Sequence, residues 1–376
     1  MYNVLTLNKI AKIGLAQLGD NYTACDECAA PDAVLVRSAA MHDMEFPQSL
    51  LAIARAGAGT NNIPIDKCTD KGIVVFNTPG ANANAVKELV LTGMLLSSRN
   101  VLGGIEWAKT LKGNGDQVGK MVEKGKSQFV GPEIMGKTLG VIGLGAIGAL
   151  VANACVALGM SVIGYDPFLT PAAAARLDAA VKTTDNLDDI YAASDYITVH
   201  VPLTADTKAM INSETISKMK DSVRIMNFSR DGLVNSTDIL AGINSGKIAA
   251  YVTDFATDDI LGEQGVIALP HLGASTPESE DNCAVMAAKE IKGYLETGAI
   301  INSVNMPRVE LDKANGARVT VIHKNDEAVA AQIKAVSAEA VTYTRGNVAY
   351  TVIDTEADVA DKIAAVDGVI RVRVIK

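Results

Sequence analysis

The sequence predicts an α/β protein built on a doubly wound parallel sheet, and three features indicate that class. From about Asp185 onward, short apolar segments alternate with helical ones, a rhythm typical of a parallel sheet covered by helices. Residues 138–148 join an apolar strand to a helix through a glycine-rich turn. Residues 316–376 follow the order strand–helix–strand–strand–helix–strand, which predicts a small ferredoxin-like module.

Composition limits the class of protein further. A chain of 376 residues exceeds the size at which one core stops growing, so we expect two or three domains. A content of 48% hydrophobic and 20% charged residues is typical of a globular protein. The net charge of -9 argues against a nucleic-acid surface. No apolar run has the length of a membrane span, and the N-terminus lacks a secretory signal, so we expect a cytoplasmic protein.

The 5 cysteines are scattered along the chain. Cys25 and Cys28 have the spacing of a metal-binding pair, but no second pair or nearby histidine completes a zinc site. We therefore expect free thiols and no metal.

The first hundred residues have a smaller α/β pattern. Its expected strands cover 33–36, 51–54 and 73–76, and a helix begins at about residue 85. Residues 109–129 are polar and rich in Gly and Lys, which predicts a surface loop around short helical turns.

In the central region, polar side chains follow successive strands. We expect strands at 195–201, 223–227, 249–253 and 265–269. Ligands of doubly wound sheets bind beyond the carboxyl ends of their strands. The residues expected at those ends are Asp166, His200, Asn227 to Arg230, Asp254 and His271, and their common position predicts one site. After it we expect a helix over 278–297, ended by Gly298, and a linker at 307–316.

The glycine-rich turn has the features of a dinucleotide site. Gly143 permits the tight turn, Gly145 lets the backbone approach a pyrophosphate, and Gly148 allows close packing of helix and strand. The pyrophosphate then lies on the unpaired N–H groups of the helix. A second strand ends at Asp166, which can accept hydrogen bonds from the ribose of NAD and repel the 2′-phosphate of NADP. An ordinary βαβ turn is the alternative, but the complete pattern predicts NAD.

Of the 4 histidines, His271 is the strongest acid–base candidate. It follows a strand end, small residues come after it, and histidine titrates near neutrality, at about pH 6.5. A structural histidine is the alternative. We expect His200 at the edge of the cofactor, and His42 and His323 in other domains.

Arg230 and a group of aspartates complete the candidate chemistry. A guanidinium can hold a carboxylate and polarise an adjacent carbonyl; a surface ion pair with Asp231 or Asp254 is the alternative role of Arg230. A carboxylate near His271 would favour its charged form. Asp254 is better placed to face the nicotinamide amide, whereas Asp258 or Asp259 could extend to His271.

These residues resemble the D-isomer-specific 2-hydroxyacid dehydrogenases over nearly the whole chain. The matching segments are 36–38, 57–62, 77–89, 143–148, 227–234 and 270–276. Within that family the chain is similar to the members that oxidise D-3-phosphoglycerate with NAD. The resemblance implies a Rossmann nucleotide domain, 91–275, inserted in a flavodoxin-like substrate domain of 1–90 and 276–306. It also implies that 316–376 are an ACT-type regulatory or assembly domain.

The resemblance assigns roles by position. The implied catalytic residues are Arg230, Asp258 and His271. The implied cofactor-binding residues are Gly143, Gly145, Ala146, Ile147, Gly148, Asp166, His200, Val201, Pro202, Thr207, Phe228, Ser229, Arg230, Asp254, His271, Gly273 and Ala274. The implied substrate-binding residues are Arg37, Ser38, Gly59, Asn82, Arg230 and His271, with backbone N–H groups near Gly80.

The chain departs from the family in three places. The usual catalytic Glu is an Asp, for which we choose Asp258 over Asp259. The Arg-Ser-Arg of some phosphate-binding members is Arg37-Ser-Ala, so Arg37 needs a further cation that the sequence does not identify. The C-terminal module keeps His323-Lys-Asn325 but lacks the usual Pro-Gly turn, leaving L-serine binding and assembly contacts as alternatives.

The expected reaction is oxidation of D-3-phosphoglycerate to 3-phosphohydroxypyruvate, the first step of phosphorylated L-serine biosynthesis. His271 takes the hydroxyl proton, the hydride leaves C2, and domain closure excludes water. One alternative is a reductase of glyoxylate, hydroxypyruvate or another 2-keto acid such as 2-oxoglutarate. The other is a non-catalytic NAD(H)-sensing protein. We expect a homodimer or homotetramer, as is usual in this fold, with no nucleic-acid or membrane partner.

Overall fold

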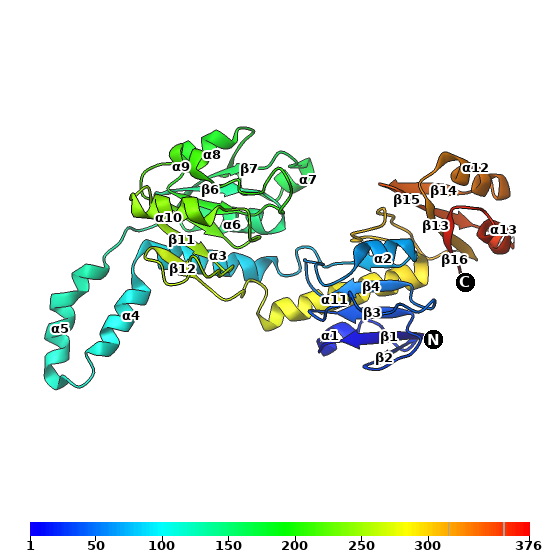
Figure 1. Ribbon diagram of the computed structural model, residues 1–376, viewed down its shortest axis with the longest axis horizontal. Helices are drawn as coiled ribbons and strands as arrows, with labels where there is room; N and C mark the ends of the chain where they lie inside the picture. Colours follow the sequence, from blue (N-terminus) through cyan, green and yellow to red (C-terminus); the bar gives the residue numbers. More distant parts are fainter. Residues whose placement is uncertain (315, 356–357) are drawn as a thin grey trace. The chain divides into compact units, whose positions relative to one another are not determined.

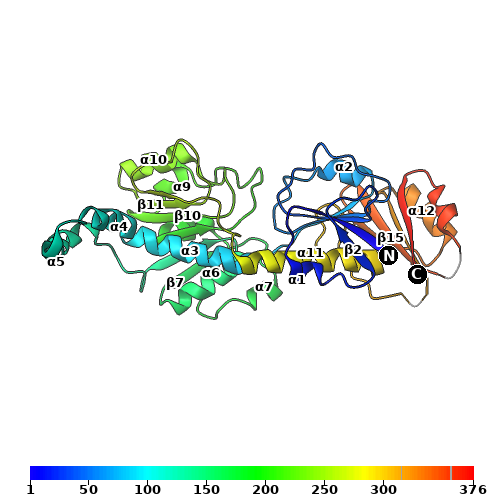
Figure 2. The same cartoon turned by 90° about the horizontal axis from the view of Figure 1, so that it is seen from below.

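The computed structural model describes residues 1–314, 316–355 and 358–376 (Figures 1 and 2). Contacts divide the chain into two units. Unit 1 combines Met1–Asn82 with Pro277–Lys376, and unit 2 is Ala83–Thr276. The chain therefore leaves unit 1 after Asn82 and returns to it at Pro277. The expected linker at 307–316 includes residue 315, which lies outside the described residues.

Unit 1 begins with a five-stranded parallel sheet in the order β2-β1-β3-β4-β5. Numbered along the chain this is 2-1-3-4-5, the order of flavodoxin-like sheets. The strands are β1 (Tyr2–Leu7), β2 (Tyr22–Cys25), β3 (Ala33–Val36), β4 (Ala52–Arg55) and β5 (Val74–Phe76). The helices are α1 (Lys12–Leu15), α2 (Ile65–Asp70) and α11 (Pro277–Thr297). Helix α1 packs on α11, where a Cβ on Gly14 would lie 2.5 Å from the Cβ of Ala284.

The C-terminal part of unit 1 is a four-stranded antiparallel sheet in the order β14-β15-β13-β16. Its elements are β13 (Arg318–Lys324), α12 (Glu327–Val336), β14 (Val341–Arg345), β15 (Val348–Asp354), α13 (Ala360–Ala364) and β16 (Val369–Ile375). This is the ferredoxin-like element order that the sequence predicts.

Arginines join this sheet to the rest of unit 1. Arg371 donates to the carbonyl oxygens of Leu50 at 2.6 Å and Lys71 at 2.9 Å. Arg373 donates to the carbonyls of Tyr294 and Leu295, which lie in the last turn of α11. Tyr350 and Ile322 also belong to the core cluster that contains the first sheet. The C-terminal sheet therefore shares a core with the first.

Unit 2 is a seven-stranded parallel sheet in the order β12-β11-β10-β9-β6-β7-β8. This order contains the 3-2-1-4-5-6 arrangement of Rossmann sheets. The strands are β6 (Thr138–Ile142), β7 (Ser161–Tyr165), β8 (Lys182–Thr184), β9 (Tyr196–Val199), β10 (Val223–Asn227), β11 (Ile248–Thr253) and β12 (Val266–Ala268). The prediction of a Rossmann-type parallel α/β fold is confirmed.

Two separate cores show that helices cover both faces of this sheet. In β10, Met226 packs with α3 and α6, whereas its neighbour Ile225 packs with α8, α9 and α10. Adjacent residues of a strand point to opposite faces, so both faces must be apolar. The helices are α3 (Ala83–Ser98), α6 (Ala146–Ala157), α7 (Pro171–Ala174), α8 (Leu187–Ala193), α9 (Ser213–Ser217) and α10 (Ser236–Asn244).

Residues 101–129 form a helical pair where the sequence analysis expects a loop over 109–129. It consists of α4 (Val101–Thr110), η1 (Gly115–Gln117), α5 (Val118–Gly125) and η2 (Lys126–Phe129). The rings of Trp107 and Phe129 pack at 5.3 Å between centroids, and neither α4 nor α5 has a buried residue. Over 109–129 the expected short helical turns are present as η1, α5 and η2, and α5 is longer than a single turn.

Among the described residues, no helix has both the length and the apolar character that crossing a membrane requires.

Candidate active site

The glycine turn between β6 and α6 leaves the start of the helix accessible. Gly143 has a φ of 94°, and a Cβ on Gly148 would lie 1.9 Å from the Gly143 carbonyl oxygen. At Gly145 a Cβ would meet nothing within 4 Å. Gly145 is also the N-cap of α6 and supplies no side-chain cap. The first N–H groups of α6 therefore have space beside them for an anion, with Ala146 exposed and Ile147 half-buried next to it.

Asp166 follows β7 and is held by the backbone of this turn. Its Oδ2 accepts a hydrogen bond from Leu144 N, and its Oδ1 accepts one from Phe168 N, both at 2.9 Å. Each carboxylate oxygen has more than one lone pair, so Asp166 can still accept from a ribose hydroxyl. Its position beside the glycine turn agrees with the predicted role.

The loop after β9 forms the next part of the edge. Burial lowers the pKa of His200 to about 4, so the ring is neutral at pH 7. Its Nε2 lies 2.9 Å from Thr198 Oγ1, and its Nδ1 has no partner among the described residues. Thr207 donates to the Pro202 carbonyl at 2.6 Å, and Ser229 Oγ donates to the Val201 carbonyl at 2.7 Å, which ties this loop to the one after β10.

Arg230 lies in the loop after β10, whose shape depends on Asn227. The amide of Asn227 donates to the Arg230 carbonyl and accepts from Ser229 N, and the preceding Phe228 is buried. The Arg230 side chain is exposed, and its Nη1 donates to the Ser229 carbonyl at 2.7 Å. In the described part of the chain it forms no ion pair with Asp231 or Asp254.

His271 is exposed just beyond β12, and Asp254 is the carboxylate that interacts with it. Asp254 is 3% exposed; burial raises its pKa, and the positive charge of His271 opposes that shift. Its Oδ2 accepts from Gly273 N at 3.2 Å, whereas Oδ1 is buried without a partner among the described residues. The His271 ring also meets the Phe255 ring edge-on, at 5.1 Å between centroids. Ala274, next in the chain, is half-buried.

Asp258 and Asp259 lie apart from this pair. Asp259 accepts hydrogen bonds from the hydroxyls of Ser236 and Thr257, which lower its pKa. Asp258 is exposed, and within the described residues neither carboxylate bonds to His271. Spacing allowed Asp258 or Asp259 to reach the ring, and the resemblance favoured Asp258, but here the electrostatic partner of His271 is Asp254.

The predicted substrate residues of unit 1 lie in the segments that follow β3, β4 and β5. Arg37 forms an ion pair with Glu280 on α11, with 2.6 Å between Nη2 and Oε1. Ser38 is exposed, and its backbone N–H donates to Asn8 Oδ1. Asn82 is half-buried and is the last residue before the crossing to unit 2.

Sequence reasoning missed Arg55, which lies directly beside Arg37. Its Nε donates to the Arg37 carbonyl at 2.9 Å, and a Cβ on Gly57 would lie 2.0 Å from its Nη1. Arg55 thus lies over the loop that continues to Gly59. The position of Arg55 at the end of the strand next to the one that Arg37 follows could have revealed it, because neighbouring parallel strands end at the same edge of a sheet. Glu280 was also missed, and nothing in its local sequence marks it.

The residues of unit 2 can hold a dinucleotide. Gly148 leaves no room for a Cβ, and the open start of α6 beside it suits a pyrophosphate. Asp166, next to that turn, suits a ribose, and the unpartnered oxygen of Asp254 suits a carboxamide.

Comparisons with known proteins agree with this arrangement. Residues 94–273 match the family described as D-isomer specific 2-hydroxyacid dehydrogenase, NAD binding domain. The D-3-phosphoglycerate dehydrogenase of Mycobacterium leprae is 34% identical over 366 residues, which are 92% of this chain and 67% of that protein. The enzyme of the same name from Synechocystis sp. is 36% identical over 75% of this chain and 50% of its own length. The chain thus spans about half to two thirds of these relatives.

Among solved structures, the NAD⁺-bound 3-phosphoglycerate dehydrogenase of Entamoeba histolytica aligns with a TM-score of 0.61 and 24% identity. The alignment covers 81% of this chain and 98% of that one. It supports the fold.

Proposed function

Since the chain belongs to the D-3-phosphoglycerate dehydrogenases, within the D-isomer-specific 2-hydroxyacid dehydrogenases, we propose that it oxidises D-3-phosphoglycerate to 3-phosphohydroxypyruvate. The observation that carries the proposal is the exposed His271 next to buried Asp254, on the same sheet edge as the glycine turn. In this role the protein acts in the cytoplasm and starts the phosphorylated route to L-serine.

NAD⁺, when bound, supplies the hydride acceptor. The N–H groups at the start of α6 would hold its pyrophosphate, Asp166 would accept from its ribose, and the free Oδ1 of Asp254 would accept from its carboxamide. The loops that carry Val201 and Ser229, joined by a hydrogen bond, would hold the nicotinamide end.

His271 acts as the general base. It takes the proton of the C2 hydroxyl while the C2–H bond breaks and its electron pair leaves as hydride. The imidazolium that forms is stabilised by the Asp254 carboxylate, which is fixed by Gly273 N and needs no reorganisation. The resemblance assigns this task to Asp258. That assignment stays a prediction, and it requires the Asp258 side chain to move toward His271.

The substrate has two anionic ends, and each unit has cations that suit one of them. The guanidinium of Arg230 is exposed and forms no ion pair with a described residue, so it can pair with the carboxylate. Arg37 and Arg55 hold the phosphate, with Gly59, Ser38, Asn82 and the N–H groups near Gly80 around the rest of the molecule. The Arg37–Glu280 pair is about 40% exposed on both sides, and a pair of that kind is worth at most about 1 kcal/mol, so a phosphate dianion can displace Glu280.

An Arg37→Ala variant tests the phosphorylated substrate. We expect the KM for D-3-phosphoglycerate to rise at least about tenfold, since one charge-assisted phosphate contact is lost. The KM for D-2-hydroxyglutarate should stay within twofold. Equal effects on both substrates would favour an enzyme for an unphosphorylated 2-hydroxy or 2-keto acid. No NAD(H)-linked turnover of any of them would favour the non-catalytic sensor.

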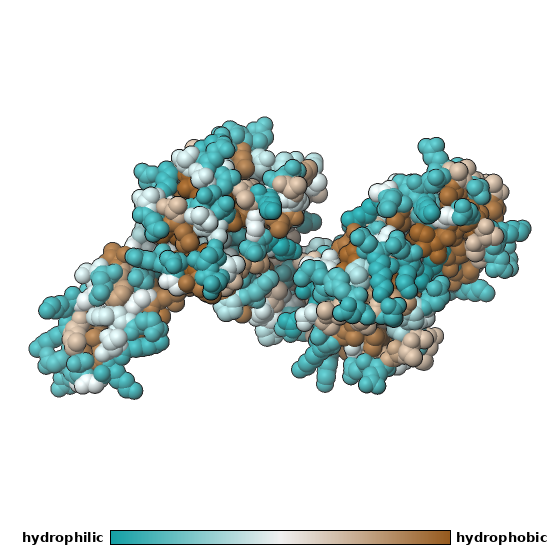
Figure 3. All heavy atoms as spheres, viewed as in Figure 1, coloured by the Kyte–Doolittle hydropathy of each residue, from teal (hydrophilic) through white to brown (hydrophobic). Residues whose placement is uncertain are grey.

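Assembly as a homodimer or homotetramer is part of the proposal. Helices α4 and α5 expose apolar residues, among them Leu102, Ile105 and Met121, and Figure 3 shows brown apolar atoms on this pair. Isolated helices of this length are marginal in water, so a second copy that covers this face would stabilise them. Sedimentation of the full chain measures the oligomer directly.

L-serine as an effector of the C-terminal module is less well supported than an assembly role. His323 is buried, and burial lowers its pKa. Its Nε2 lies 2.8 Å from Thr351 Oγ1, and Asn325 donates to the Gly346 carbonyl. These side chains hold the module together, and Arg373 attaches it to α11. A serine titration of the activity distinguishes the two roles.

A further inference from the structure

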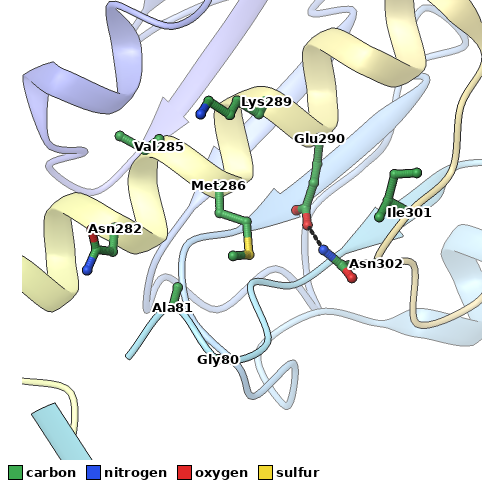
Figure 4. Close-up of a pocket in the computed structure, with 9 residues that line it drawn as sticks. All are labelled: Gly80, Ala81, Asn282, Val285, Met286, Lys289, Glu290, Ile301 and Asn302. Carbon is green, nitrogen blue, oxygen red and sulfur yellow. Dashed lines mark hydrogen bonds between the residues drawn. The ribbon is translucent and has the colours of Figure 1, made fainter. Parts of the chain in front are cut away.

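Unit 1 contains a cavity of about 500 Å³ that, apart from Gly80, uses none of the residues discussed above. One face of α11, the loop of Gly80 and Ala81, and the segment Ile301–Asn302 surround it (Figure 4). Gly80 and Ala81 come just before the chain leaves unit 1 at Asn82, and α11 begins where it returns. The cavity therefore touches both segments that lead to the crossings between the units.

A buried carboxyl group lies at the back of the cavity. Glu290 is 7% exposed, and its Oε1 accepts a hydrogen bond from Asn302 Nδ2 at 2.6 Å. Its Oε2 is buried with no partner among the described residues. Figure 4 shows the side chain pointing from α11 toward Asn302 and the loop of Gly80. An ionised carboxylate left without a partner in such a place is costly, and burial raises the pKa of Glu290 to about 8.

The remaining walls limit what can pair with this oxygen. Val285, Met286 and Ile301 are apolar and half-buried, which suits a short hydrocarbon body. Lys289 is exposed at the rim, and in Figure 4 its Nζ lies away from Glu290. A cation at Glu290 would satisfy the unpartnered oxygen, while the charge of Lys289 disfavours a second positive charge in the ligand.

We propose that this cavity binds a small monoamine as its ammonium ion, with Glu290 as the counter-ion. An N–H of the ammonium donates to Oε2, Oε1 keeps its bond from Asn302, and the alkyl body lies on Val285 and Ile301. Met286 moves aside to admit the nitrogen, because its unbranched side chain can change rotamer without a backbone shift. Where Glu290 is protonated before binding, its proton is released to solvent.

A chain of hydrogen bonds leads from Glu290 to the predicted substrate loop. Asn302, bonded to Glu290 by its side chain, accepts from Asn77 N through its carbonyl at 3.2 Å. The amide of Asn77 in turn donates to the Ala58 carbonyl at 2.6 Å, and Thr78 N donates to the Gly57 carbonyl. An occupied cavity should therefore change the KM of the acid substrate. This consequence rests on the proposed function, whereas the binding itself does not.

Calorimetry on the full chain tests the site, with n-butylammonium as the probe and n-butanol and butyrate as controls. We expect saturable binding of the ammonium alone, at least tenfold weaker in Glu290→Gln and unchanged in Asp281→Asn, which removes an exposed charge elsewhere on α11. Affinity should rise with pH up to about 8, with proton release below that value. The amine itself stays protonated to about pH 10. Absence of saturable binding, or equal binding by Glu290→Gln, would overturn the proposal.

A second variant guards against misfolding of the first. Met286→Phe replaces the side chain that must move aside with a rigid ring and keeps the carboxyl group, and it too should lose the probe; retained binding would contradict the assigned position of the ammonium. In the kinetic arm, n-butylammonium should shift the KM for D-3-phosphoglycerate at least twofold in the wild type and not in Glu290→Gln. Binding without that shift would overturn only the connection to the substrate loop. A protein that binds the probe but does not oxidise D-3-phosphoglycerate would contradict only the proposed function.

Discussion

Asp254 accepts a hydrogen bond from Gly273 N and interacts electrostatically with His271. One buried carboxylate is therefore held by the backbone next to the expected base. Its burial is unfavourable for the charge, and the neighbouring imidazolium compensates for part of that cost. The same group has a free oxygen for the carboxamide. We therefore propose that Asp254 has two tasks, which the resemblance divides between Asp254 and Asp258.

Replacement of either aspartate distinguishes these assignments. We expect Asp254→Asn to lower kcat about tenfold to a hundredfold, because the charge opposite the imidazolium is lost, whereas Asp258→Asn should leave kcat within twofold. Steady-state kinetics of both purified variants is the measurement. The opposite ranking would show that Asp258 moves to His271 during the reaction.

His271→Ala should remove the base while leaving the fold intact, since the ring is exposed. We expect kcat to fall about 10²–10⁴-fold, the range for loss of general-base catalysis, with little change in the dissociation constant of NADH. Fluorescence titration of NADH provides the control. An unchanged kcat would exclude His271 as the base.

At the level of elements, the β6–α6 turn is the most constrained part of unit 2. A Cβ at Gly148 would lie 1.9 Å from the Gly143 carbonyl oxygen, an overlap that backbone atoms cannot relieve by rotation. We therefore expect Gly148→Ala to lower the free energy of unfolding by about 1–3 kcal/mol and to weaken NAD binding. Urea unfolding and an NADH titration measure these effects. Gly119→Ala, where a Cβ meets nothing within 4 Å, is the matched control.

Helix α11 should make stability depend on pH through Glu290. This carboxyl group titrates near its ordinary 4.5 in the unfolded chain and near 8 in the folded protein. The unfolded state therefore releases its proton first, and stability falls as pH rises from about 4.5 to 8, then levels off. Glu290→Gln lacks this loss and should exceed the wild type by a few kcal/mol at pH 8, about 1.4 for each unit of the shift. Equal slopes of the two proteins in urea unfolding between pH 5 and 8 would contradict the shift.

Strands with a continuous apolar run could be predicted from the sequence, and weakly patterned elements could not. Residues 223–227 were placed at the bounds that β10 has, because the strand is largely buried and polar residues follow it. In β2 only Tyr22 is buried, so the strand has no apolar signal and was not anticipated. Helices α4 and α5 bury nothing, and the polar, Gly- and Lys-rich sequence of residues 109–129 resembles that of a loop.

The candidate site shows the same limit for side chains. The sequence correctly predicted that Asp166, Arg230, Asp254 and His271 follow strand ends at the sheet edge, because the apolar pattern of a strand shows where it stops. Which carboxylate interacts with His271 depends on loop conformation; spacing left Asp258 and Asp259 open, and the resemblance led us to choose Asp258. Arg55 was missed because the expected strand ended one residue earlier, at 54, and only the pairing of β3 with β4 brings it to Arg37.

At the scale of the whole molecule, each of the three sheets has a different proposed part in the function. The Rossmann sheet carries the cofactor-binding turn and the proposed base, the first sheet of unit 1 carries the phosphate-binding candidates, and the C-terminal sheet is joined to α11 by Arg373. The same helix also contributes Glu280 and Glu290. Helix α11 therefore takes part in both proposals for unit 1.

The most direct test of the central claim is NADH formation by the purified protein from NAD⁺ and D-3-phosphoglycerate, beside D-lactate and D-2-hydroxyglutarate. The reaction is run at high pH with the ketone trapped, because oxidation of this alcohol by NAD⁺ is unfavourable. The account predicts turnover of D-3-phosphoglycerate with the highest kcat/KM, abolished by His271→Ala. Turnover of only an unphosphorylated acid would contradict the proposed substrate.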